Sequence, residues 1–145
     1  MKIIHVTDIH SYTGKLELLK GVNSDLIIIS GDFVECGEDL DRYLRVLEKF
    51  RKLNVRVLYV PGNCDPREAL DIPSEENTIN LHGSYFKYDK YIFIGLGGSV
   101  FTPFNTPLEF SEDELENILE GTLSKVLRSE KISIRTLTLW KLCNY

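Results

Sequence analysis

The sequence predicts an α/β fold whose first half is a βαβαβ unit with a parallel sheet. Three short runs rich in β-branched and other apolar residues, at 3–6, 26–29 and 55–60, alternate with segments that have helical spacing or a helix-ending glycine. Strands that alternate with helices in this way form parallel sheets joined by right-handed crossovers. Each run also ends in a cluster of polar residues, which is typical of the carboxyl edge of such a sheet.

The elements of the first half follow from the spacing of apolar side chains. The run at 3–6 is apolar on both faces, so we expect a strand buried in a sheet that is covered on both sides. A short helix is expected over 13–21, where Gly21 ends it. From 38 to 53 apolar residues recur at helical spacing, and Glu, Lys and Arg occupy the opposite face. The third strand is expected at 55–60.

The second half changes to shorter strands and a long helix. Strands are expected at 80–81, 84–88 and 91–94, the last two joined by a tight turn. Ser111 and Glu114 have the spacing of a capping box, which predicts that a helix begins there.

The tail over 132–140 alternates β-branched residues and would form a strand if it had a partner. Internal repeats and linkers are absent from the sequence, so we expect one domain over residues 1–145.

Composition and charge exclude several classes of protein. With 43% hydrophobic and 27% charged residues in 145, the chain has the composition of an ordinary globular domain. It lacks both a run of the ~20 apolar residues that span a membrane and the pattern of a signal peptide. A net charge of −5 argues against a general nucleic-acid surface. A phosphate substrate remains compatible with it, because bound cations can reverse the local sign.

The cysteines indicate a compartment. Cys36, Cys64 and Cys143 are an odd and widely spaced set, so we expect no disulfide framework. We therefore expect a reducing compartment and a cytoplasmic location.

Polar residues that can bind metals stand at the ends of the first three strands: Asp8, His10, Asp32 and Asn63. In an extended backbone, the spacing of Asp8 and His10 puts both side chains on the same side. Carboxylate, imidazole and amide ligands suit Mn, Fe, Zn or Co better than calcium. A carboxylate on the middle strand can bridge two ions about 3.5–4 Å apart, as in two-metal displacement at phosphorus. The alternative is that these residues cap turns.

In this order the motifs D-x-H, G-D and G-N-x-D resemble those of the calcineurin-like metallophosphoesterase family. The G-N-C-D form is similar to the family's small archaeal and bacterial phosphodiesterase branch. The resemblance covers residues 1–100, including the loop at 97–99. It implies a four-layer αββα sandwich and a divalent-metal-dependent phosphoesterase that hydrolyses phosphodiesters with a metal-bridging hydroxide.

The same resemblance implies roles for single residues. Asp8 and His10 would bind the first metal, Asp32 would bridge, and Asn63 would bind the second metal and the substrate phosphate. One or two ions of Mn, Fe, Zn, Ni or Co are implied per chain, with a small phosphoester as the substrate. The candidate catalytic residues are Asn63, Asp32 and Cys64.

The chain departs from the family pattern at two places. Many relatives carry a histidine at the position of Cys64 that is thought to protonate the leaving group, and a thiol with a pKa near ~8.5 is a weaker acid for this step. The family's later Gly-His and Gly-His-x-His motifs are also missing, since His82, the one histidine after Asn63, matches neither. We therefore expect a truncated form of the αββα sandwich.

Other candidates have structural explanations. Asp65 is expected to cap a helix with Pro66 at its first position. His5 is expected to be a packed histidine or one at a strand edge, and His82 a loop residue. The glycine loop at 95–98 lacks the full dinucleotide fingerprint, so nucleotide binding there is the weakest interpretation.

Two functions from different classes remain. One is the phosphoesterase, and the other is a catalytically inactive remnant that binds metal weakly and acts through assembly. Because the absent family strands would leave open sheet edges, we also expect a homo-oligomer.

Overall fold

A computed structural model describes residues 1–130. The strand predicted at 132–140 lies outside the described residues. None of the helices in the described part has the length and apolar character to cross a bilayer.

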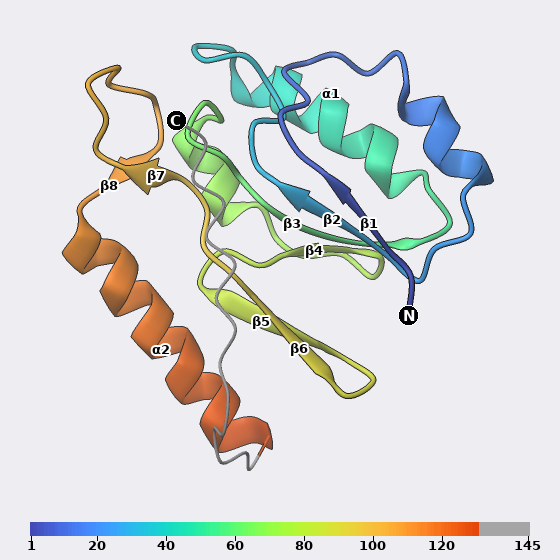
Figure 1. The fold of residues 1–145 in the computed structure, drawn as a ribbon. Coiled ribbons are helices and arrows are strands. Elements are labelled where there is room, and N and C mark those ends of the chain that lie inside the picture. Colours follow the sequence, from blue (N-terminus) through green and yellow to red (C-terminus); the bar gives the residue numbers. More distant parts are fainter. Residues whose placement is uncertain (131–145) are drawn as a thin grey trace.

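The centre of the fold is the predicted parallel sheet (Figure 1). It consists of β1 (Ile3–Val6), β2 (Leu26–Ser30), β3 (Arg56–Val60) and β4 (Thr78–Asn80), hydrogen-bonded in that order. All three pairings are parallel, so the carboxyl ends of β1, β2 and β3 lie at one edge. The predicted βαβαβ order is confirmed, while β4 begins earlier than the strand expected at 80–81.

One face of this sheet is covered by α1 (Leu40–Arg51). The Asp39 carboxylate caps the first turn of this helix by accepting from the Arg42 amide at 2.8 Å. The short helix expected over 13–21 is a 3-10 helix over Leu16–Gly21. Most of the buried side chains of this face come from β2, β3, α1 and the connection after β2: Ile27, Ile29, Phe33, Val34, Tyr43, Val46, Leu47, Phe50, Val57 and Tyr59.

The other face is covered by the hairpin of β5 (Ser84–Tyr88) and β6 (Tyr91–Gly95). Three of its aromatic side chains, Phe86, Tyr88 and Phe93, pack on a second core built from Leu26, Leu58 and Leu81. Next to the hairpin lies α2 (Glu112–Glu130) (Figure 1). The resulting order of α1, sheet, hairpin and α2 is the layering of the predicted αββα sandwich.

Short elements connect these layers. A 3-10 helix, Arg67–Asp71, follows β3, and β7 (Ser99–Val100) pairs in parallel with β8 (Glu109–Phe110). A helix was expected to begin at Pro66, and the structure has this 3-10 helix there. The two-residue strands β7 and β8 were not predicted, because strands so short carry no periodicity. The capping box is confirmed, since the Ser111 hydroxyl accepts from the Glu114 amide and the Glu114 carboxylate accepts from the Ser111 amide.

The prediction that the first strand is buried on both faces is wrong. In the described sheet β1 is an edge strand, and Ile3 is 40% exposed. The interior positions belong to β2 and β3, where Leu26, Ile27 and Leu58 are fully buried.

Candidate metal centre

The loops that follow β1 and β2 are joined by backbone hydrogen bonds. The amides of Ile9 and His10 both donate to the carbonyl of Asp32, at 2.8 and 3.0 Å. The amide of Ser11 donates to the carbonyl of Phe33 at 2.8 Å. The backbone of the D-x-H segment is therefore fixed on the backbone that carries Asp32.

The backbone at this junction is left-handed at residues that are not glycine. The φ angles of Asp8, His10 and Asp32 are 52°, 43° and 51°. The prediction that an extended backbone aligns Asp8 with His10 is wrong, because β1 ends at Val6 and both residues lie beyond it. Such conformations are costly for residues with a Cβ and cluster at functional sites.

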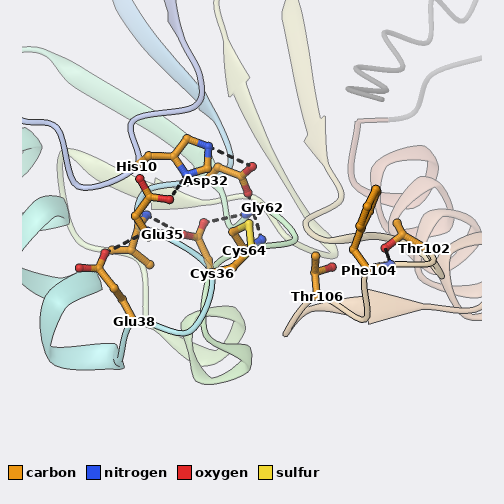
Figure 2. Close-up of a disulfide and its surroundings, with 12 residues drawn as sticks. His10, Asp32, Glu35, Cys36, Glu38, Gly62, Cys64, Thr102, Phe104 and Thr106 are labelled. Atoms are coloured by element: carbon orange, nitrogen blue, oxygen red, sulfur yellow. Dashed lines mark hydrogen bonds and ion pairs between the residues drawn. A yellow bond between two sulfur atoms is a disulfide. The ribbon is translucent and has the colours of Figure 1, made fainter.

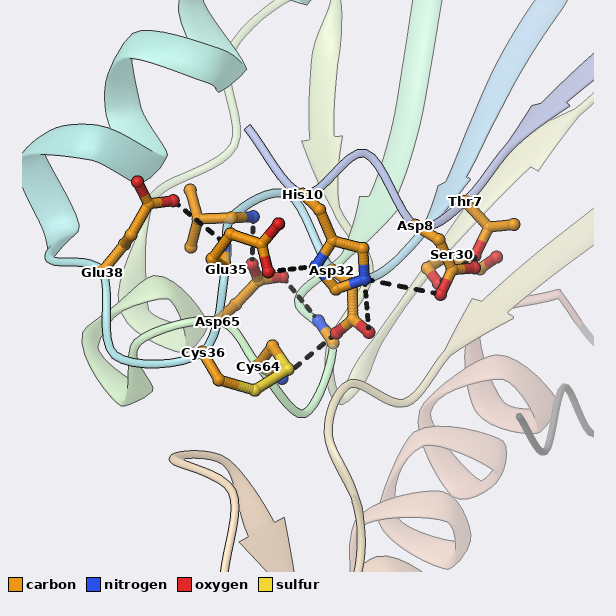
Figure 3. Close-up of polar contacts among 12 residues, drawn as sticks. Thr7, Asp8, His10, Ser30, Asp32, Glu35, Cys36, Glu38, Cys64 and Asp65 are labelled. Atoms are coloured by element: carbon orange, nitrogen blue, oxygen red, sulfur yellow. Dashed lines mark hydrogen bonds and ion pairs between the residues drawn. A yellow bond between two sulfur atoms is a disulfide. The ribbon is translucent and has the colours of Figure 1, made fainter. Parts of the chain in front are cut away.

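The turns bring three side chains together. Asp8, His10 and Asp32 each offer one ligand atom, and these atoms lie within 4.8 Å of one another. His10 Nε2 is 3.8 Å from Asp8 Oδ1 and 3.9 Å from Asp32 Oδ2 (Figure 3). Two carboxylates and one imidazole form a donor set that suits a divalent transition metal.

The electrostatics of Asp32 favour a cation at this point. The Asp32 side chain is 16% exposed, against 40% for Asp8. Burial raises the pKa of the Asp32 carboxyl, and the hydrogen bond from the Cys64 amide is the largest opposing cause. Since a bound cation would offset the cost of burying this carboxylate, the residues present fit a metal ion.

The loop after β3 reaches the same place through its backbone. The Cys64 amide donates to Asp32 Oδ1 at 3.1 Å. A Cβ at Gly62 would lie 2.1 Å from that same oxygen, so the loop approaches Asp32 as closely as glycine allows. Asn63, between these residues, is half-buried, and its carbonyl accepts from the Leu108 amide at 3.0 Å. Its role as a ligand stays a prediction.

Asp65 is not the helix cap that we expected. Its carboxylate accepts from the amides of Gly62 at 2.7 Å and Val34 at 3.0 Å, and so ties the loop after β3 to the loop after β2. The 3-10 helix that follows has no side-chain cap. Burial raises the pKa of Asp65 to about 7, and the two amides oppose this.

Cys64 forms a disulfide with Cys36, which corrects the expectation that the cysteines form no disulfide framework (Figure 2). The pair joins the loop after β2 to the loop after β3, 28 residues apart in sequence. In this form Cys64 has no thiol proton, so it cannot serve as the general acid considered for that position. Sequence spacing could not reveal the pair, because it depends on two loops meeting at one sheet edge.

Glu35 is a residue of the site that sequence reasoning missed. Its Oε2 lies 3.5 Å from His10 Nδ1, on the side of the ring opposite Asp8 and Asp32 (Figure 3). Its position three residues after Asp32 was the only sequence signal.

The two other histidines have structural roles. His82 Nδ1 accepts from the Gly97 amide at 2.9 Å, and its ring stacks on Phe110. His5 Nε2 is 2.5 Å from the Ser30 hydroxyl. The Gly98 amide donates to the Pro61 carbonyl at 2.9 Å, so the amides of Gly97 and Gly98 in this glycine loop are already used, which weakens the nucleotide interpretation.

Comparisons with known proteins agree with this geometry. Residues 1–138 match the sequence profile of a family described as calcineurin-like phosphoesterase. The chain is 36% identical over 123 residues to the uncharacterized protein MJ1162 of Methanocaldococcus jannaschii. That match covers 82% of this chain and 53% of the relative, so the chain spans about half the relative's length.

A solved structure, that of TT1561 of Thermus thermophilus, matches 89% of this chain with a TM-score of 0.66. The match covers 62% of that chain at 18% identity, so the likeness is one of fold.

Proposed function

The chain belongs to the calcineurin-like phosphoesterase family, and from that premise we propose that it is a divalent-metal-dependent hydrolase of phosphodiesters. The observation that carries the proposal is the convergence of Asp8, His10 and Asp32 within 4.8 Å at the carboxyl edge of the sheet. Ligands of open α/β sheets bind at this edge.

Each residue has a defined task in this proposal. Asp8 and His10 would hold the first ion, together with Asp32, the most buried of the three, which also accepts from the amide of Cys64 beside Asn63. Asn63 would supply an amide oxygen for a second ion and an amide N–H for a phosphoryl oxygen. Bound divalent ions supply positive charge to the phosphoryl oxygens and acidify water. The left-handed backbone fixes the carboxylates before substrate arrives, which lowers the reorganisation needed during reaction.

Diesters with good leaving groups are the favoured substrates. In the disulfide form Cys64 cannot donate a proton, and the described site contains no other group that we assign as a general acid. Esters whose leaving group departs without protonation should therefore be hydrolysed faster than esters that must release an alkoxide.

The test is hydrolysis of bis(p-nitrophenyl) phosphate with Mn²⁺, measured for the wild type, Asp32→Ala and Glu76→Ala. Glu76 is exposed, so Glu76→Ala is a matched control that also removes one carboxylate. We expect Asp32→Ala to lose at least ~100-fold in kcat/KM and Glu76→Ala to keep the wild-type value.

Equal turnover by Asp32→Ala would contradict the assignment. If the wild type showed no turnover and took up no metal, the result would instead support an inactive protein that acts through assembly. The hydrolysis rate of the monoester p-nitrophenyl phosphate, measured in parallel, tests the preference for diesters. Faster hydrolysis of the monoester would contradict that preference.

A further inference from the structure

The His10 ring has two chemically distinct sides. Nε2 faces the two carboxylates of the candidate centre, and Nδ1 faces Glu35. A neutral imidazole that binds a metal through Nε2 must carry its proton on Nδ1. Metal-binding histidines usually donate that proton to a carboxylate or carbonyl, which fixes the ring.

His10 Nδ1 lacks a hydrogen-bond partner among the described residues although it is buried. Glu35 Oε2, at 3.5 Å, is the carboxylate oxygen that faces it. The Glu35 side chain is 65% exposed, so its own packing does little to hold it in place.

The backbone on either side of Glu35 is anchored. The Val34 amide is held by Asp65, and Cys36 is held by the disulfide to Cys64. The Glu35 backbone is also held by Glu38, whose carboxylate accepts from the Glu35 amide at 2.9 Å and whose amide donates to the Glu35 carbonyl at 3.0 Å. Opening the disulfide would remove the covalent cross-link beside Glu35 and so let its exposed side chain leave the ring.

We propose that Glu35 is a positioning residue that orients His10 for metal binding, and that the Cys36–Cys64 disulfide keeps Glu35 in place, so that metal affinity depends on the redox state of this pair. The proposal rests on the metal site proposed above. A dithiol reductant would open the pair by thiol–disulfide exchange, leaving two thiols in the protein and a disulfide in the reductant.

The first measurement needs no metal. In ¹⁵N-labelled protein at alkaline pH, where imidazoles are neutral, two-bond ¹H–¹⁵N correlations report which ring nitrogen carries the proton. We expect the Nδ1–H form for His10 and, as an internal reference, the Nε2–H form for His82, whose Nδ1 accepts from Gly97. Glu35→Ala should convert His10 to a mixture of both forms, and Glu35→Gln should keep more of the Nδ1–H form because its carbonyl can accept.

The second measurement is Mn²⁺ affinity by calorimetry in a Cys143→Ser background, which removes the third cysteine. Glu35→Ala should weaken binding by about 10-fold, as for other residues that support a metal ligand. Reduction by a phosphine, which water converts to the phosphine oxide as both sulfurs gain hydrogen, should weaken wild-type binding but leave Glu35→Ala unchanged. Cys36→Ser should match the reduced protein.

The outcomes distinguish the positioning role of Glu35, the redox link and the proposed function from one another. Unchanged tautomer and affinity in Glu35→Ala would overturn the positioning role, and an equal effect of reduction on wild type and Glu35→Ala would overturn the redox link. Free cysteines at 36 and 64 that do not pair on mild oxidation would also overturn that link. A wild type that shows the expected tautomer but binds no Mn²⁺ would contradict the proposed function instead.

Discussion

At the scale of single residues, the chemistry of the centre depends on loop residues whose neighbours are distant in sequence. Asp65 is followed by Pro66 and a helical segment, which is the local signature of a cap. In the structure its carboxylate instead accepts from Gly62 and Val34, one of them on another loop. A local pattern could suggest that the carboxylate accepts backbone amides, but it could not identify which amides.

We expect the loss of folding stability at alkaline pH to depend on Tyr59. Burial raises the pKa of Tyr59 to about 12, and its hydroxyl has no hydrogen-bond partner in residues 1–130. The pKa of Tyr59 in the folded state exceeds its unfolded value of ~10. The contribution of neutral Tyr59 to folding stability is therefore complete below pH ~10 and is lost as the pH rises through ~12.

Tyr59→Phe keeps the ring in the core and removes this ionisation. Its free energy of unfolding, measured in urea, should rise relative to that of the wild type by about 1.8 kcal/mol between pH ~9 and pH ~11.5. Parallel pH dependence of the two proteins would contradict the prediction.

At the scale of elements, the close approach of the loops after β2 and β3 depends on Gly62. An alanine Cβ there would lie 2.1 Å from Asp32 Oδ1 and 2.2 Å from the Asp32 amide nitrogen. Gly62→Ala should therefore displace Asp32, weaken Mn²⁺ binding at least ~10-fold and destabilise the fold by about 1–3 kcal/mol.

Gly121→Ala is the matched control, because a Cβ at Gly121 in α2 meets no atom within 4 Å. It should leave Mn²⁺ affinity unchanged and stabilise the helix by about 1 kcal/mol. Equal Mn²⁺ affinities for the two variants, measured by calorimetry, would contradict the packing argument.

The regular elements were predictable because their signals are local. The β-branched runs of β2 and β3 and the apolar stripe of α1 follow from side-chain periodicity alone. The edge position of β1 was not predictable in the same way, since it depends on the order of strands in the sheet. The composition of the candidate ligand triad was predictable, whereas the left-handed backbone that brings the three residues together was not.

At the scale of the whole molecule, the expected homo-oligomer remains a prediction. In the described residues β5 and β6 pair with each other, and only the isolated bridge between His82 and Gly95 extends that sheet. Open strand edges favour pairing with another chain. Sedimentation velocity at micromolar concentration should show a species larger than the monomer, and a single monomeric boundary would contradict the prediction.

The central claim is that Asp8, His10 and Asp32 together hold a divalent cation. Anomalous diffraction from a crystal soaked in Mn²⁺ tests it most directly. The account predicts a manganese peak within coordination distance of a carboxylate oxygen of Asp8, His10 Nε2 and a carboxylate oxygen of Asp32. A well-ordered site with no peak between these three side chains would contradict it.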